Sequence, residues 1–178
     1  RSEAYRSESR KPVVKPATLE EDLSRRDFTI NAMAQKVIAS GLSKKIVDPY
    51  DGQKDLKAKI LRTPLDPTET FSEDPLRMLR AARFAAQLGL PAKSGSSSSW
   101  EIEVHTLKAM RENRERLTIV SAERIQEELY KLLATPVPSV GFFVLHRTGV
   151  LHEFLPEVSN LEGVEDMYGQ THKDNLIH

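Results

Sequence analysis

An acid and three arginines, each three residues after the last, are the side chains best spaced for chemistry in this sequence. The row consists of Asp74, Arg77, Arg80 and Arg83. On a helix, a spacing of three keeps such side chains on adjoining parts of one surface. Residues spaced four apart along the same segment are largely apolar, and Arg80 lies among them, between Leu76 and Phe84. A guanidinium within an apolar ridge is costly without an anion, so we expect either a negatively charged ligand or a buried acid partner.

Asp74 and Arg77 would offer a hydrogen-bond acceptor beside a donor. Cytosine and adenine share an edge on which an exocyclic amine donates and a ring nitrogen accepts, whereas uracil and guanine present a carbonyl and a ring N–H there. The pair could therefore select C and A, with Arg80 and Arg83 holding phosphates of the same nucleotide. The alternative is a salt bridge between Asp74 and Arg77 along the helix, worth about 0.2–0.5 kcal/mol.

A second candidate site lies at Arg25-Arg26-Asp27. We expect Asp27 to begin a helix, whose free N–H groups and dipole favour anions. Asn31 follows four residues later, one helical turn along. Arg26 is suited to phosphate, and Asp27 or Asn31 to ribose hydroxyls. The alternative is that Asp27 only caps the helix and that the arginines face solvent.

The end of the sequence gives a weaker hint of metal binding. His172 and His178 flank Asp174 there. A spacing of six turns the two histidines away from each other on a helix, and the sequence offers no third ligand to complete a site.

The elements that must position these residues are short strands followed by helices. Apolar residues at the offsets of an amphipathic helix predict a helix over residues 30–38, with Gly41 as its stop. Residues 46–47 and 60–61 are β-prone and are separated by a turn sequence over residues 48–52, which indicates a small hairpin or two strand ends.

From Ser72 onward the pattern is helical. Ser72 is predicted to cap the arginine helix, and Gly89 and Pro91 to end it. Further helices are predicted over residues 102–110, from Ser121 to residue 133 with Ile125, Leu129, Leu132 and Leu133 inward, and over residues 140–147 before Gly149. Residues 93–99 form a serine-rich stretch that we expect to be a mobile loop. The fold class is therefore α+β and mostly helical.

Composition limits the function classes. The sequence has 178 residues, of which 39% are hydrophobic, and no apolar run approaches the length of a membrane span, so we expect a soluble protein. Lys plus Arg and Asp plus Glu each number 26, so any phosphate-binding surface must be local. The absence of cysteine excludes thiolate metal sites and suits a reducing cytoplasm. The first residue is not methionine, and we expect the chain to be cut from a longer one.

Four motifs in order resemble those of the class II tRNA nucleotidyltransferases of the DNA polymerase β superfamily, which comprise CCA-adding enzymes and bacterial poly(A) polymerases. The motifs are residues 19–34 around Arg26-Asp27, Asp48-Pro49 with Gly52, Glu73-Asp74 with Arg77, and residues 121–125 with Glu128. The resemblance implies that Arg26 and Asp27 contact ribose and phosphate, that residues 48–52 link the head and neck domains, and that Asp74 and Arg77 read the base. It also implies nucleotide contacts for Arg80 and Arg83.

The same resemblance implies a domain organisation, a reaction and its partners. Residues 1–64 would be the C-terminal part of a nucleotidyltransferase head, residues 65–135 a helical neck, and residues 136–178 a helical body that approaches an HD-type phosphohydrolase domain. The implied reaction adds CCA to tRNA 3′ ends from CTP and ATP with Mg²⁺, in the cytoplasm. A poly(A) polymerase and a non-catalytic RNA-binding module are the alternatives that the motifs leave open.

The sequence departs from this family at the metal site. Members carry an Asp-x-Asp pair before the Arg-Arg-Asp motif, and this sequence has no Asp-x-Asp. Glu3 is the acid near the start that could approach metals, and His178 would correspond to the first metal-binding histidine of an HD-type domain. We therefore expect this chain alone to bind nucleotide poorly and to be catalytically inactive.

Overall fold

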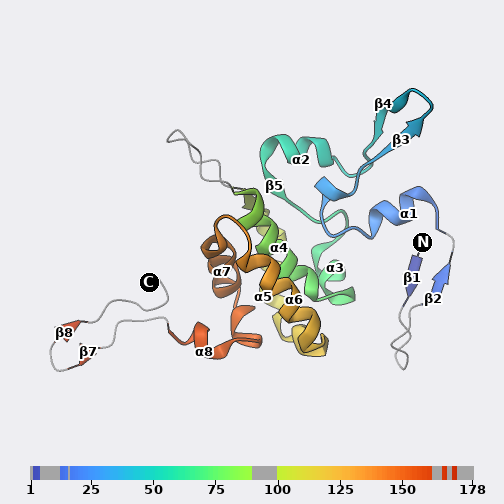
Figure 1. Cartoon of the computed structure of the whole chain (residues 1–178). Coiled ribbons are helices and arrows are strands. Elements are labelled where there is room, and N and C mark those ends of the chain that lie inside the picture. The colour runs from blue at the N-terminus through green and yellow to red at the C-terminus, as the bar shows by residue number, and fades with distance from the viewer. Residues whose placement is uncertain are drawn as a thin grey trace, which may run out of the picture.

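The computed structural model shows a helical body with a β-hairpin at one side (Figure 1). It describes residues 17–89 and 100–161, and four short strands of which only the backbone is described, residues 2–4, 13–15, 166–167 and 170–171. The first two strands, β1 (Ser2–Ala4) and β2 (Val13–Lys15), pair antiparallel, as do β7 (Asp166–Met167) and β8 (Gln170–Thr171). The predicted loop over residues 93–99 and the side chains of Glu3, His172 and His178 lie outside the described residues.

Helix α1 (Leu19–Ser24) begins at a capping box. The Thr18 hydroxyl accepts from the Glu21 N–H, and the Glu21 carboxylate accepts from the Thr18 N–H at 2.7 Å. These two bonds satisfy backbone donors that the first turn of a helix leaves free. After α1 the chain turns through residues 25–28 into a short 3₁₀ helix, η1 (Thr29–Asn31).

The predicted helix over residues 30–38 is wrong. Strand β3 (Ala34–Ile38) pairs antiparallel with β4 (Gly41–Val47), and Gly41 makes the turn between them with a φ of +118° instead of stopping a helix. The apolar offsets fit a helix, but Val37 and Ile38 are β-branched and exposed, so no buried helical face exists to reward that pattern.

The segment after the hairpin also differs from its prediction. Strand β5 (Ile60–Leu61) does not pair with β4 but lies parallel to β6 (Glu101–Ile102), and the predicted turn is the start of helix α2 (Gly52–Ala58). Asp48 stabilises that start, because its carboxylate accepts from the N–H groups of Gly52 at 2.7 Å and Gln53 at 2.9 Å. The Pro and Gly of this stretch mark a helix entry rather than a hairpin turn.

The arginine row lies on α4 (Leu76–Leu88), which follows α3 (Pro67–Glu73) directly. The predicted cap at Ser72 is wrong, since Ser72 lies within α3. The break falls at Asp74 and Pro75 because a proline disfavours helical geometry in the residue before it, and Asp74 is extended with φ −140° and ψ 94°. Gly89 forms the C-cap of α4 as predicted.

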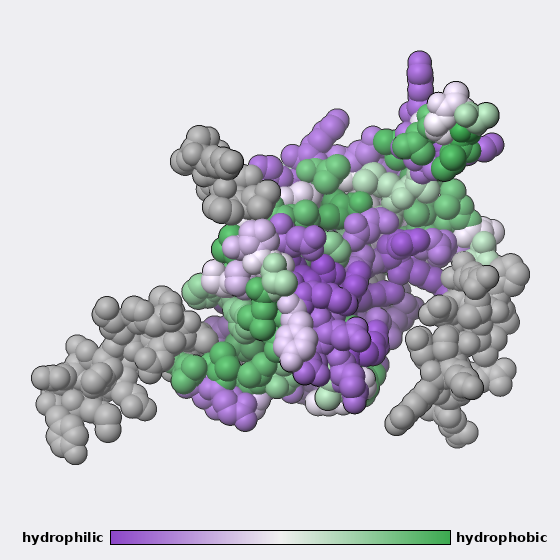
Figure 2. Space-filling view, in the orientation of Figure 1, coloured by the Kyte–Doolittle hydropathy of each residue, from purple (hydrophilic) through white to green (hydrophobic). Residues whose placement is uncertain are grey.

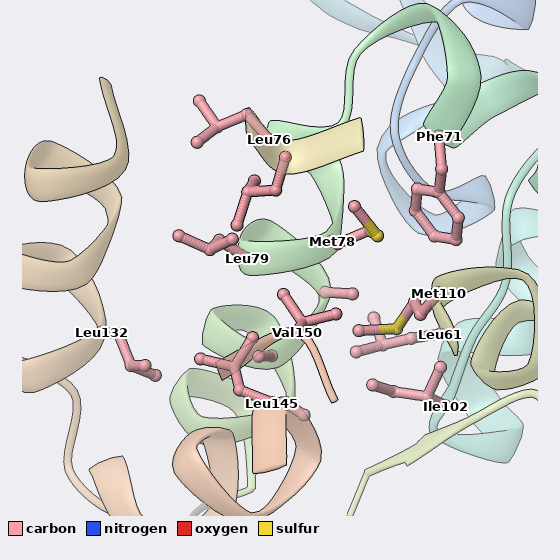
Figure 3. Close-up of a cluster of buried hydrophobic side chains, with 14 of the residues drawn as sticks. Leu61, Phe71, Leu76, Met78, Leu79, Ile102, Met110, Leu132, Leu145 and Val150 are labelled. Carbon is pink, nitrogen blue, oxygen red and sulfur yellow. The ribbon is translucent and has the colours of Figure 1, made fainter. Parts of the chain in front are cut away.

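Helix α4 is central to the hydrophobic core (Figure 3), which it forms with α5, α6 and α7. The remaining elements are α5 (Val104–Asn113), η2 (Arg114–Ile119), α6 (Ala122–Leu133), α7 (Pro138–Arg147), η3 (Leu151–Glu153) and α8 (Pro156–Ser159). The three later helices are thus confirmed near their predicted positions. Leu132 is buried as predicted, but Leu133 is exposed, and Ser121 occupies the N-cap position of α6 without a side-chain capping bond.

Helices and short strands together confirm the α+β, mostly helical class. None of the helices in the described residues is long and apolar enough to cross a membrane. The face shown in Figure 2 carries a broad hydrophilic region over the middle of the molecule, while apolar atoms gather on the hairpin and at the lower edge.

Candidate functional site

Six of the seven side chains expected to bind nucleotide line one cleft of about 440 Å³: Arg26, Asp27, Asn31, Asp74, Arg77 and Arg80. The cleft forms where the chain between α1 and η1 faces the junction of α3 and α4 and the start of α6. Arg25 and Arg124 complete its charged lining. Five arginines and two aspartates leave an excess of three positive charges, which suits an anionic ligand.

Both carboxylate oxygens of Asp27 accept hydrogen bonds. Its Oδ1 accepts from its neighbour's N–H, that of Phe28, at 3.0 Å and from the Asn31 amide at 3.1 Å. Its Oδ2 accepts from both Nε and Nη2 of Arg80, at 2.9 Å and 2.5 Å. Asp27 therefore does not cap a regular helix, as one alternative proposed, but joins the turn before η1 to α4.

Arg80 has the buried acid partner that its place on the apolar ridge predicted. Besides Asp27, its Nη1 lies 3.5 Å from Oε1 of Glu128 on α6. Burial alone lowers the pKa of Arg80, but Asp27 and Glu128 raise it more, so the net shift is upward. The guanidinium thus connects three segments of the chain and already has two anions beside it.

Arg83 does not line the cleft. Its Nε donates to Glu128 Oε2 at 2.8 Å and its Nη1 to Gln87 Oε1 at 2.9 Å. Its guanidinium also stacks 4.4 Å from the ring centroid of Phe84. The structure therefore separates Arg83 from the other six candidates.

Glu128 on α6 forms ion pairs with both Arg80 and Arg83 of the arginine row. Burial raises its pKa, but hydrogen bonds from Arg83 and Lys131 and the charges of Arg83 and Arg80 lower the pKa more, so the carboxyl stays ionised. Its carboxylate also accepts from Lys131 Nζ at 3.0 Å.

Asp74 and Arg77 do not form the salt bridge that was the alternative to base reading. Asp74 pairs instead with Arg124, whose Nη2 lies 3.1 Å from Oδ2. Arg77 donates to the carbonyl of Arg25 at 2.8 Å and to that of Thr70 at 3.3 Å. Both side chains reach the cleft from one helix junction, with a carboxylate acceptor beside a guanidinium donor.

Arg26 and Asn31 line the cleft from the segment that runs from the end of α1 through η1. Arg26 donates to Asp22 at 2.7 Å, and this bond holds the pKa of Asp22 below its ordinary value. Asn31 donates to Asp27, so its amide is oriented by the acid.

Arg124 is the cleft residue that sequence reasoning missed as a candidate. It lies in the motif quoted around residues 121–125, but its spacing from the arginine row gave no signal. Its place opposite Asp74 arises only from the packing of α6 against α4.

The residues present do not fit a catalytic metal centre. The described ranges contain no group of three or more His, Cys, Asp or Glu side chains that could hold a metal ion. In the cleft, the two carboxylates are already paired with Arg80 and Arg124.

Two family models match the chain. Residues 1–62 match the poly(A) polymerase head domain, and residues 100–161 match a domain described as the probable RNA- and SrmB-binding site of polymerase A.

Known proteins of similar sequence and structure agree with these matches. The Multifunctional CCA protein of Pseudomonas aeruginosa (strain LESB58) is 42% identical over 149 residues, covering 83% of this chain and 33% of that protein. That of Neisseria gonorrhoeae (strain NCCP11945) is 47% identical over 153 residues, covering 84% and 33%. The Bacillus stearothermophilus CCA-adding enzyme in complex with CTP superposes with a TM-score of 0.69 at 34% identity, over 81% of this chain and 33% of that one. A tRNA nucleotidyltransferase complexed with a primer tRNA and an incoming ATP analogue gives 0.67 at 30% identity, over 83% and 42%.

The fold is that of a nucleotidyltransferase head segment followed by helices. The chain belongs to the family of CCA-adding enzymes and poly(A) polymerases, which confirms the predicted resemblance. It spans about a third of the length of the curated relatives that it matches.

Proposed function

We propose that this chain is the nucleotide-selecting part of a tRNA nucleotidyltransferase that adds CCA to tRNA 3′ ends from CTP and ATP. The observation that carries the proposal is the shared cleft. Asp74 and Arg77, an acceptor and a donor from one helix junction, line one positively charged space together with Asp27 and Asn31. This arrangement would read the amine and ring nitrogen of C or A on one wall while the arginines meet the phosphates.

The relatives support the substrates. The proteins of similar sequence are named for CCA, and the similar structures include complexes with CTP, with an ATP analogue and with a primer tRNA. We therefore assign tRNA, CTP and ATP as partners of the whole protein. Residues 1–64, 65–135 and 136–178 are assigned to head, neck and body.

The geometry supports a role for each site residue. Arg26 is assigned to phosphate, Asn31 to ribose, and Asp74 with Arg77 to the base. Asp27 and Arg80 use most of their hydrogen-bonding capacity on each other, so we assign them to holding the cleft as well as to contacting the nucleotide. Arg83 is assigned to packing with Glu128 and Phe84. We propose that the reaction of the whole protein uses Mg²⁺, and we assign none of the described residues to the metal.

Equilibrium dialysis of the chain with each of the four nucleoside triphosphates tests the base reading. CTP and ATP should bind, although weakly for this chain alone, and compete for one site, while UTP and GTP should bind more weakly still. Asp74→Ala should remove this preference while the chain stays folded by circular dichroism. Equal binding of all four triphosphates to the unaltered chain would contradict the proposal.

A chimera tests the reaction. The matching 149 residues of the Pseudomonas aeruginosa protein, 42% identical, are replaced by those of this chain. The chimera should add C, C and A to a tRNA that lacks CCA. A poly(A) polymerase is the second candidate, because both matching family models carry that name; incorporation from ATP without incorporation from CTP would favour it.

A further inference from the structure

An ion pair forms part of the lining of the cleft where the base is proposed to bind. Arg124 at the start of α6 places its Nη2 3.1 Å from Oδ2 and 3.3 Å from Oδ1 of Asp74. The pair lies at the surface, with 52% of the Arg124 side chain and 31% of the Asp74 side chain exposed. Asp74 therefore has a hydrogen-bond donor from its own chain.

Of the two partners, Asp74 is the fixed one. Its backbone is the C-cap of α3 and precedes Pro75, and its Oδ1 also accepts from the Leu76 N–H at 3.3 Å. The Arg124 guanidinium sits at the end of a long side chain on another helix, and exposed ion pairs of this kind are weak. When the pair opens, Arg124 is the side chain that moves.

The contact and the proposed base compete for the same oxygens. The exocyclic amine of cytosine or adenine is a nitrogen donor directed at a carboxylate, as is Arg124 Nη2. Uracil presents a carbonyl at that position. Because a carbonyl cannot donate a hydrogen bond to the Asp74 carboxylate, uracil does not displace the arginine.

We propose that Arg124 is an internal competitor of the base: its guanidinium pairs with the Asp74 carboxylate and is displaced when C or A binds there. The proposal rests on the proposed function, because it requires that Asp74 accepts from the base. Arg124 lowers the affinity for cytosine and adenine without lowering that for uracil, by the factor of about 1.5 to 5 that an exposed ion pair contributes. Screening by salt weakens the pair and so relieves this competition.

Uncharged nucleosides separate this effect from phosphate binding. Cytidine and uridine are titrated into the full chain and followed by the amide signals of Asp74 and Leu76 in NMR spectra. Arg124→Gln should bind cytidine about 1.5 to 5 times more tightly than the unaltered chain does, with uridine unchanged. Raising NaCl should strengthen cytidine binding to the unaltered chain and leave the variant unaffected.

Arg116→Gln is the matched control. Arg116 also joins two elements, since it donates to the Ser72 carbonyl at 2.9 Å, but it does not line the cleft. This variant should bind cytidine as the unaltered chain does.

The outcomes distinguish the two proposals. If the unaltered chain prefers cytidine to uridine but Arg124→Gln binds cytidine no better, the competition is disproved and base reading stands. If neither protein distinguishes the two nucleosides, base reading fails and the competition fails with it.

Discussion

At the scale of single residues, Arg80 shows what a sequence pattern can and cannot predict. Its position on an apolar ridge required an anion, and the structure supplies Asp27 and Glu128. The pattern could not say which acids, because Asp27 lies 53 residues before Arg80 and meets it only through tertiary packing. For the same reason Arg124 was missed, although Asp74 itself was a candidate.

Replacing Arg80 by leucine should destabilise the fold. The change leaves Asp27, which is 8% exposed, without its main partner, and an unpaired buried carboxylate is costly. We expect a loss of about 2–3 kcal/mol in the free energy of unfolding, below the value for a fully buried pair because a third of Arg80 is exposed. Urea unfolding measures it.

Combining Arg80→Leu with Asp27→Asn provides the control. A neutral amide needs no counter-charge, so the double variant should recover part of the loss that Arg80→Leu causes. A single Arg80→Leu variant as stable as the unaltered chain would mean that the Asp27 pair contributes nothing to folding.

At the scale of elements, the predictions succeeded where a long apolar period meets a buried face, as in α6 and α7. The predictions failed for the short strands, because a short strand contains too few residues for the spacing of its apolar side chains to distinguish it from a helix. The hairpin of β3 and β4 has apolar residues at helical offsets, yet its side chains are mostly exposed, so burial could not select between the two structures. The helix α2 was missed because the turn residues Asp48 and Gly52 can equally start a helix.

The packing of α2 against η1 leads to a prediction for Gly52. A Cβ at this position would lie 2.2 Å from the Thr29 carbonyl oxygen, so any side chain must push the two elements apart. Gly52→Ala should lower the free energy of unfolding by about 1–3 kcal/mol. Hydrogen exchange should also increase in α2 and in residues 27–31, because Thr29 is joined to Asp55 on α2 by a 2.7 Å hydrogen bond. Lys54→Ala, at an exposed position of the same helix, should change neither.

The pairing of α4 with α6 through Glu128 makes stability depend on pH. Burial raises the folded pKa of Glu128, but the bonds from Arg83 and Lys131 and the charges of Arg83 and Arg80 lower it more. The folded pKa is therefore below the unfolded value of 4.5, and the stabilisation is fully present above that value. It is lost as the pH falls through the folded pKa. Urea midpoints measured between pH 6 and pH 3 should therefore fall less steeply for Glu128→Gln than for the unaltered chain. Parallel curves for the two proteins would contradict this assignment.

At the scale of the whole molecule, charge is balanced overall but not locally. The 26 basic and 26 acidic side chains cancel, whereas the cleft lining has an excess of three positive charges. Average composition therefore gave no sign of an anion site, and only the meeting of α1, α4 and α6 creates one. The local field of such a cleft, rather than net charge, attracts phosphates.

Inorganic tripolyphosphate tests whether the cleft or the general surface attracts anions. It should raise the melting temperature of the chain, because a ligand that binds only the folded state stabilises it, and NaCl should reverse the effect. Arg26→Gln removes a cleft charge and should weaken tripolyphosphate binding about two- to five-fold, as expected for one exposed charge contact. Arg116→Gln changes the net charge equally outside the cleft and should leave binding unchanged. Equal weakening in both variants would show that tripolyphosphate binding depends on the net charge of the protein, which would contradict a phosphate-binding site in the cleft.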